Sequence, residues 1–144
     1  MSLGAGRAAS TREYQVLSTT NITSTGSQNY TVPAGTLYLE IEMWGGGGGG
    51  GFGGANIGRG GQQHFNGGGG GGGGYVKHKI LNVNVMEDAV VNFTVGAGGA
   101  GDTNANGQAA AGGDTTLNSI TPDGDSTTSL SGPSAGGGDG GHSK

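Results

Sequence analysis

The sequence has no cysteine, only three prolines and a single tryptophan among its 144 residues. Without cysteine, the chain can form neither a disulfide scaffold nor a zinc–thiolate site, and it has no thiol nucleophile. Charged residues make up only 11% of the chain, with a net charge of -4. The six basic residues are scattered and form no basic stripe, so we expect no nucleic-acid binding.

Long hydrophobic runs are also missing. No stretch of 18 apolar residues occurs, and the first 20 residues contain no apolar segment resembling a signal peptide. We therefore expect neither membrane insertion nor export by the usual signal route. No segment shows helical periodicity with capping residues, which predicts an all-β fold.

Glycine is abundant instead. Fifteen of the 38 glycines form two uninterrupted runs, at residues 45–51 and 67–74. Ordering both runs would cost about 7–15 kcal/mol relative to alanine, as much as the usual stability of a whole domain. The runs are therefore either mobile linkers or segments held by dense backbone hydrogen bonds. We favour packed polyglycine-II helices or extended strands, with packing positions at Gly45, Gly48, Gly51, Gly67, Gly70 and Gly74.

The clearest strand is residues 37–44, which enters the first glycine run. It places Leu37, Leu39, Ile41 and Met43 on one face, with the period of two expected of a half-buried strand. Further short strands are expected at residues 13–17, 28–32, 75–85, 90–95, 115–120 and 127–130. A change of phase at Ile80 suggests a bulge, and we expect residues 75–85 and 90–95 to form a hairpin.

These short strands predict a small antiparallel sandwich or jelly roll with extended polyglycine segments. We divide the chain into an N-terminal docking arm with a first strand at residues 1–27 and a glycine-rich β domain at residues 28–144. Because only 31% of the residues are hydrophobic, the core must be small. We therefore expect that the chain does not fold stably as a monomer.

Four motifs follow one another in a recognisable order: YTVPAG at residues 30–35, MW and glycines at 43–51, GGYV at 73–76, and FTVGAGGAG at 93–101. This order, continued by a glycine-rich tail, resembles the glycine-rich domain of bacteriophage virion proteins, especially tail-fibre and tail-tip proteins. The resemblance covers roughly residues 28–141. It implies a structural virion protein that forms an exposed appendage or decoration on the tail or capsid surface. It also implies self-association, as a homotrimer, and contact with other virion proteins.

Two candidate contact regions follow from this interpretation. Arg7 and Arg12 lie in a segment without acidic residues, which we expect to dock into an acidic groove of another virion protein. The loop between the glycine runs is a candidate recognition loop for a host-surface glycan or protein. Its candidate residues are Phe52, Asn56, Arg59, Gln62, Gln63, His64 and Phe65. A dedicated receptor-binding adhesin is therefore the alternative function, and a non-viral glycine-rich matrix or ice-binding protein is a third.

No enzymatic function or cofactor is expected. The glycine runs match a dinucleotide fingerprint only trivially because no βαβ unit is predicted, and no Lys-Ser or Lys-Thr follows Gly74 to make a phosphate loop. The three histidines have no metal-ligand spacing, and we expect Glu40 and Glu42 to be solvated or subunit-facing. Calcium is the one ligand alternative, because residues 98–102 and 136–139 resemble glycine-rich calcium turns and residues 123–125 place two acids close together. The repeat that makes such sites is absent.

Overall fold

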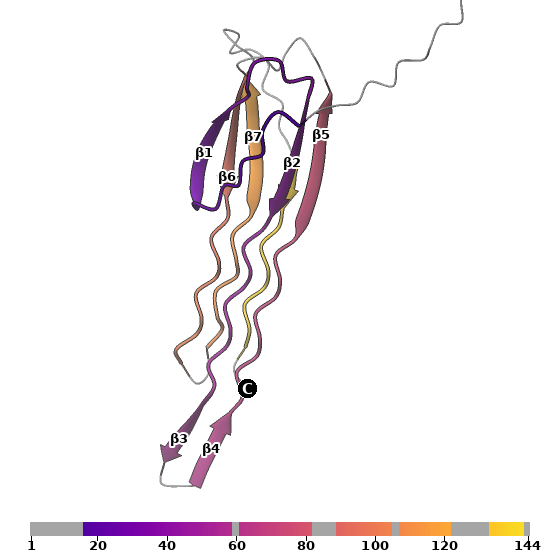
Figure 1. Ribbon diagram of the computed structural model, residues 1–144. Helices are drawn as coiled ribbons and strands as arrows, with labels where there is room; N and C mark the ends of the chain where they lie inside the picture. Colours follow the sequence, from indigo (N-terminus) through magenta and orange to yellow (C-terminus); the bar gives the residue numbers. More distant parts are fainter. Residues whose placement is uncertain (1–15, 59–60, 82–88, 105–106, 122–132, 143–144) are drawn as a thin grey trace, which may run out of the picture.

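The computed structural model describes residues 16–58, 61–81, 89–104, 107–121 and 133–142, and these form an all-β structure. Figure 1 shows a β-sheet head from which wavy, nearly parallel segments descend to a distal hairpin. The strands are β1 (Gly26–Thr31), β2 (Tyr38–Trp44), β3 (Gly54–Gly58), β4 (Gly61–Phe65), β5 (Tyr75–Leu81), β6 (Val90–Val95), β7 (Thr115–Thr121) and β8 (Ser134–Ala135).

The head is a small antiparallel sandwich, as the sequence predicts. One sheet has the strand order β1-β6-β7-β8, and the other consists of β2 and β5. Apolar side chains from both sheets meet between them, which excludes water from the centre of the head. The buried residues of this core are Val32, Met43, Ala89, Val91, Leu117, Ile120 and Ala135.

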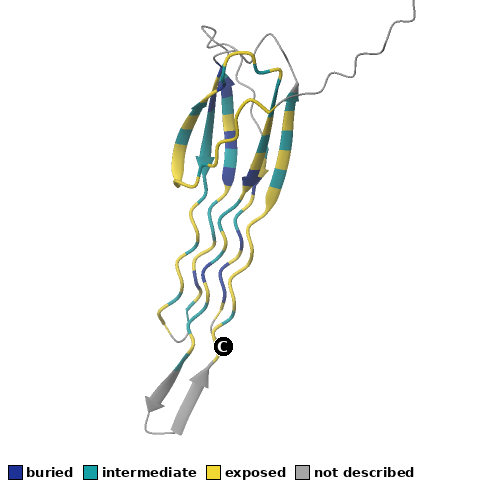
Figure 2. Ribbon diagram, in the orientation of Figure 1, coloured by how far each residue is buried: buried dark blue, intermediate teal, exposed yellow. Residues whose placement is uncertain are grey.

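Alternation along β2 decides which side chains enter the core. Leu39, Ile41 and Met43 pack in or against the core, whereas Trp44 at the end of the strand is 60% exposed. Figure 2 shows the corresponding alternation of burial along the head strands. Leu37, expected on the inner face, lies before the strand begins and is 40% exposed.

Two expectations about strand pairing are wrong. β5 pairs with β2 and not with β6, which lies in the other sheet between β1 and β7. The pairing of β2 with β5 continues in register through Ile80 and Leu81, so the expected bulge is absent from β5 as described. A register shift occurs instead between β6 and β7, where Asn118 is the extra residue. Residues 82–88 and 122–132 are outside the described residues, and so is the candidate strand at 127–130.

Below the head, five glycine-rich segments run side by side. We call them lattice helices I (residues 45–51), II (67–74), III (96–102), IV (108–113) and V (136–142). Each is continuous with a head strand: β2 leads into I, II into β5, β6 into III, IV into β7, and β8 into V. The antiparallel pairing of β2 with β5 therefore continues as the antiparallel pairing of I with II.

Hydrogen bonds between the lattice helices repeat every third residue. The N–H groups of Gly45, Gly48 and Gly51 donate to helix II, and those of Gly46 and Gly49 donate to helix IV. Such a period requires three residues per turn, which is the geometry of a polyproline-II-type helix and not of a β-strand. The glycine runs are therefore polyglycine-II helices, packed against segments of the same chain.

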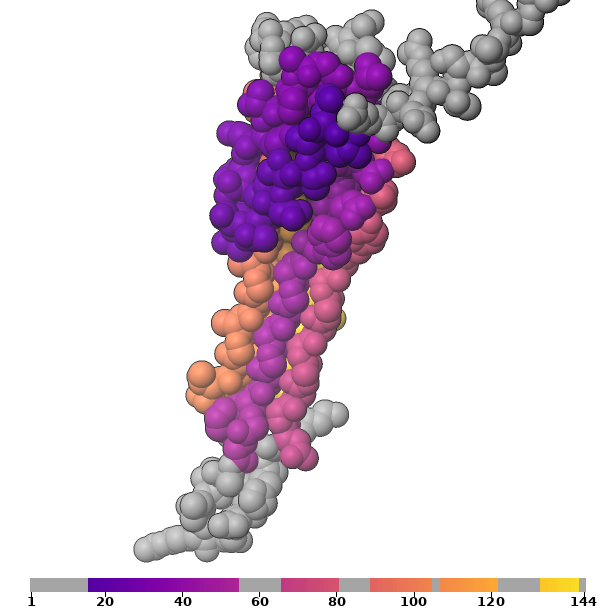
Figure 3. Space-filling model, viewed as in Figure 1, coloured from indigo at the N-terminus to yellow at the C-terminus, as the bar shows by residue number. Residues whose placement is uncertain are grey.

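The five helices form two nested rows. Helix I lies in the middle and is hydrogen-bonded to II, III, IV and V, while IV is also bonded to III and V, and II to V. This pattern places III, I and II in one row and IV and V in the other. Figure 3 shows the first row from outside, with helix I between helices III and II. Sixteen backbone hydrogen bonds join described residues of the lattice, each contributing about 0.5–1.5 kcal/mol, which is comparable to the cost of ordering the glycines.

Close contact between backbones explains why side chains are missing from the interior of the lattice. A Cβ atom on Gly70 would lie 2.7 Å from Gly49 O and closer still to Gly48 O. One on Gly138, which is buried, would lie 2.7 Å from Gly72 O. Contacts this short with backbone atoms leave no space for a methyl group, as at the axis of collagen.

Thr115 connects the head to the lattice. Its buried hydroxyl donates to Trp44 O (2.7 Å) at the start of helix I and accepts from Gly96 N–H (2.9 Å) at the start of helix III. The hydroxyl thereby gives hydrogen-bond partners to one backbone carbonyl and one backbone N–H group at the junction between the head strands and the lattice helices.

Replacing Gly70 by alanine is expected to destabilise the fold by about 1–3 kcal/mol or more, as for an overpacked core. Gly136→Ala is the matched control, because the nearest atom to its added Cβ would be Asp114 Oδ1 at 3.9 Å. The control should leave stability unchanged or raise it by about 0.4–1 kcal/mol through the unfolded state. Chemical denaturation measures both values, and equal stability of the two variants would contradict a packed lattice.

Thr115→Val is expected to lower the free energy of unfolding by about 1–3 kcal/mol, because a part-buried backbone donor and a part-buried backbone acceptor lose their shared partner. Thr116→Val is the control, since the Thr116 hydroxyl donates only to Asn118 Oδ1 at an exposed site, and should change stability by less than about 0.5 kcal/mol. A thermal unfolding series measures the difference. An unaffected Thr115→Val variant would show that the hydroxyl does not link head and lattice.

Candidate functional site

The β3–β4 hairpin occupies the end of the lattice opposite the head (Figure 1). Gly54 pairs with Phe65 and Gly58 with Gly61, so the two strands extend the antiparallel pairing of helices I and II. The segment expected to be a loop between the runs is therefore a paired hairpin. Its position at the tip follows from the length of the two glycine runs, which carry it away from the head.

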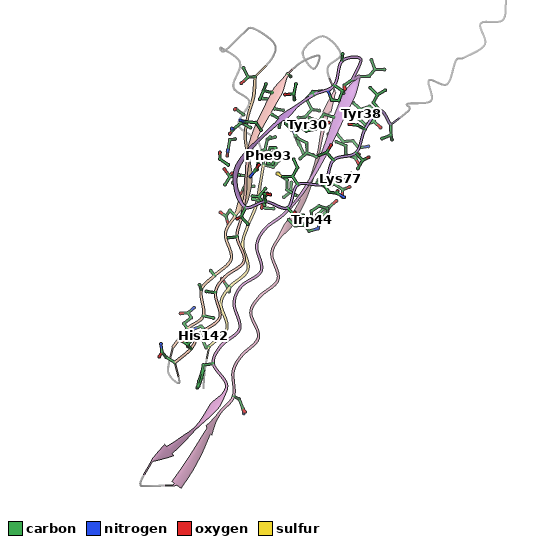
Figure 4. All side chains as sticks on the ribbon, turned by 60° about the vertical axis from the view of Figure 1, so that its left-hand side comes forward. Tyr30, Tyr38, Trp44, Lys77, Phe93 and His142 are labelled. Atoms are coloured by element: carbon green, nitrogen blue, oxygen red, sulfur yellow. The ribbon has the colours of Figure 1, made fainter. Side chains whose placement is uncertain are left out.

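Trp44 and Tyr75 form an exposed aromatic pair where helices I and II leave the head. They are directly opposed in the β2–β5 register, with ring centroids 5.2 Å apart and planes tilted by 41°. Trp44 is 60% and Tyr75 51% exposed, although large aromatic side chains usually bury most of their surface. The pair lies on the outer face of β2 and β5, where Figure 4 shows Trp44 near Lys77.

A ladder of opposite charges covers the rest of that face. Lys77 Nζ lies 2.7 Å from Glu40 and 2.9 Å from Glu42, and Lys79 Nζ lies 3.0 Å from Glu40. Hydrogen bonds from Lys77 and Lys79 lower the pKa of Glu40, and the hydrogen bonds with Glu40 and Glu42 raise the pKa of Lys77. Glu40 and Glu42 are thus ion-pair partners of the lysines on the opposite strand, an arrangement that supports the pairing of β2 with β5.

Amide side chains form a second polar array, on the outer face of the larger sheet. Asn92 Nδ2 donates to Asn29 Oδ1 (2.7 Å), and Asn118 Nδ2 donates to both Asn92 Oδ1 and Thr94 Oγ1 (2.9 Å each). These bonds run across β1, β6 and β7. They orient a row of exposed amides of the kind that can hydrogen-bond polar ligands.

The residues singled out from the sequence fall into three groups. Arg7, Arg12 and Arg59 lie outside the described residues. The recognition candidates of the hairpin lie on β3 and β4, of which the backbone alone is described, while Phe52 is half-buried beside Gly54. All the packing glycines lie in helices I and II, and an added Cβ would meet backbone at 3.2 Å or less at each of them: Gly45, Gly48, Gly51, Gly67, Gly70 and Gly74.

No group of three or more His, Asp or Glu side chains that could hold a metal ion occurs within the described part of the chain. Of the calcium candidates, Asp102 and Asp139 lie on helices III and V, whereas residues 123–125 are outside the described residues. Asp102 Oδ1 accepts from Asn104 N–H (2.9 Å), while its buried Oδ2 has no hydrogen-bond partner. None of the described segments is a helix long and apolar enough to cross a membrane.

Sequence reasoning missed helices III, IV and V and the role of Thr115. Clusters of glycine with alanine, GAGGAG at residues 96–101, AAAGG at 109–113 and GGGDGG at 136–141, were the available signal. They resemble the two pure runs in carrying few side chains larger than a methyl group. The second and third clusters start 27 residues apart, at residues 109 and 136, and the chain between them contributes β7 and β8 to the head.

Comparison with known proteins identifies a family for the chain. The family model described as "Glycine-rich domain" matches residues 22–144. The chain belongs to this glycine-rich domain family. The match includes every strand and all five lattice helices of the glycine-rich domain. No curated protein and no solved structure matches the chain.

The charge ladder predicts a pH-dependent contribution to stability. Since the pKa of Glu40 is lowered from 4.5, its contribution is present above pH 4.5 and is lost as the pH falls through the lowered value. Glu40→Gln should therefore slightly lower the melting temperature at pH 7, with a difference from the wild type that shrinks in acid and in high salt. Glu42→Gln, which removes one ion pair in place of two, should have the smaller effect. A difference that stays constant from pH 7 to pH 3 would contradict this assignment.

Proposed function

We propose that this glycine-rich domain protein is a structural protein of a bacteriophage virion. In this proposal it is an exposed, homo-oligomeric appendage or decoration of the tail fibre, tail tip or capsid surface and contributes to particle assembly. The ordered motifs of residues 28–141, which resemble virion proteins, support the proposal. The role is structural, with no catalytic step.

The observation that carries the proposal is a rod held by backbone hydrogen bonds between two different ends. The lattice spans the distance from the head to the β3–β4 hairpin without a side-chain core (Figure 1). Such a rod is narrow and held along its whole length, which suits a part that projects from a particle. Its two ends can serve separate purposes, attachment at one and exposure at the other.

The head is the end that we assign to attachment. The described chain begins at Val16, and Ser18 Oγ lies 3.1 Å from Tyr30 OH on β1, so the described chain starts at the head. Arg7 and Arg12 precede this point, and we propose that they bind an acidic surface of another virion protein. The hairpin then points outward.

An adhesin that recognises a host-surface glycan or protein is the second candidate function. The observation in its favour is the hairpin at the tip of the rod, where it is the part of the described chain furthest from the head. Binding residues are commonly found on loops and tips that a rigid scaffold positions. This function is compatible with the structural role and would add host attachment to it.

Purified particles of the phage whose genome encodes the chain provide the test of the structural role. Mass spectrometry should find the chain in gradient-purified virions, and a tag inserted between β3 and β4 should be reached by antibody on intact particles, whereas a tag before Arg7 should not. Presence of the chain only in the soluble lysate would reject the virion assignment. An accessible N-terminal tag with a hidden hairpin tag would reverse the orientation.

The adhesin function has a separate test. Replacing residues 54–65 by two glycines should leave particle yield unchanged and slow adsorption to host cells by about tenfold or more, the effect of losing roughly 1.4 kcal/mol of binding. Unchanged adsorption by complete particles would reject the adhesin function while leaving the structural role intact.

A further inference from the structure

Helix I lacks two of the neighbours that its backbone can bond. With three residues per turn, its N–H groups point in three directions 120° apart, and its carbonyl groups point in the three directions between them. Two donor rows are used by helices II and IV, and two acceptor rows by helices III and V. The N–H groups of Gly47 and Gly50 and the carbonyls of Gly45 and Gly48 have no such partner among the described residues. Two adjacent lattice positions, between helices II and III, are therefore open.

The sequence keeps this open face free of side chains, although the fold does not require it. Every lattice helix has at least one row of residues, three apart, that points away from the lattice. In helices III, IV and V one outward row carries exposed side chains: Ala97 and Ala100, Gln108 and Ala111, Asp139 and His142. Helix III also exposes Gly98 and Gly101, whose added Cβ atoms would have Gly47 O and Gly50 O as their nearest neighbours. In helices I and II the outward rows are glycine: Gly47, Gly50, Gly69 and Gly72.

Space within the chain does not explain these four glycines. A Cβ on Gly69 or Gly72 would have no atom within 4 Å, and one on Gly47 or Gly50 would be 3.6 Å or 3.8 Å from the nearest atom. The glycine at position 136 on helix V is similarly open, but Asp139 and His142 follow it in the same row. Packing within the chain does not require glycine at these four positions. Their glycines therefore suggest that the backbone of another chain approaches this face closely.

We propose that this open face binds helix II of a second copy of the chain. The occupant must present acceptors at every third residue and no side chains, because it has to approach helix I as closely as its own neighbours do. Helix II meets both requirements, and it lies at the edge of the row with residues 67 and 69–74 all exposed. This inference gives a contact surface to the homo-oligomer of the proposed function and rests on that part of it.

Hydrogen-bond polarity decides how the copies are related. All bonds within the lattice run in the same three directions, from I to II and IV, from II to V, from III to I, from IV to III and V, and from V to I. A two-fold axis parallel to the helices would rotate the donor directions of one copy onto the acceptor directions of the other. The N–H groups of the two copies would then face each other across the contact. A rotation by one third of a turn maps donor directions onto donor directions. The second copy's helix II then lies against helices I and III, and this heterologous contact closes after three copies.

The aromatic pair described above lies at the head end of this contact. Trp44 precedes helix I and Tyr75 follows helix II, and both rings are more than half exposed. Exposed aromatic side chains of this kind commonly anchor protein interfaces. In the trimer they would continue the contact from the lattice onto the outer face of β2 and β5.

Analytical ultracentrifugation of the purified full chain tests the contact without any virion component. The wild type is expected to sediment at three times the chain mass of 13.9 kDa. The double variant Gly69→Ala/Gly72→Ala should sediment at the mass of one chain, because its methyl groups would meet the partner backbone as a Cβ on Gly70 meets Gly48 O. Circular dichroism should show that this variant keeps the wild-type fold, and Gly136→Ala should remain trimeric.

A wild type that sediments as a monomer or a dimer would overturn the proposal, and so would a double variant that remains trimeric. A chain that is trimeric in solution but absent from purified particles would reject the proposed function alone. A chain that is present in particles but monomeric in solution would reject this interface alone.

Discussion

The hydrogen bond between two glycine backbones, repeated at every third residue, is the interaction on which the rest of the structure depends. It forms only where two chains approach without Cβ atoms between them, which limits the lattice interior to glycine and a few alanines. The same bonds offset the large conformational entropy that glycine loses on folding. A polymer segment that would be a flexible linker in isolation thereby becomes a rigid element.

Head and lattice each supply what the other lacks. The lattice has no side-chain core and therefore cannot select the register of its own helices, since every glycine resembles the next. The head has few core residues, but its alternating side chains specify the pairing of β2 with β5 and of β6 with β7. Because each lattice helix continues a head strand, the side chains of the sandwich determine which carbonyl each glycine meets. Thr115 lies at the junction where the paired strands of the head continue as the hydrogen-bonded helices of the lattice.

Sequence alone predicted the sandwich, the main strand and the ordered state of the two glycine runs. Alternation along β2 is a strong local signal, and the entropy cost of the runs required a backbone lattice or mobility. It did not predict that β2 pairs with β5, because alternation assigns faces to a strand without naming its partner. Helices III to V were missed since short mixtures of glycine and alanine are common in loops, and only their neighbours in space distinguish them. Of the candidate contact residues, the packing glycines lie where interior packing needs them, while the arginines of the docking arm stay predictions.

The period of three in the lattice limits how such a chain can change its length. Removing one residue from helix I would turn everything beyond that point by a third of a turn, so donors aimed at helix II would face helix IV or the open side. Removing three residues restores every direction and shortens the helix by about 9.3 Å. The same change must be made in the neighbouring helices, or the bonds at the far end lose their partners. Rods of this type can therefore be lengthened or shortened only in whole turns shared by all five helices. The distance between the head and the distal hairpin then changes in steps of one turn.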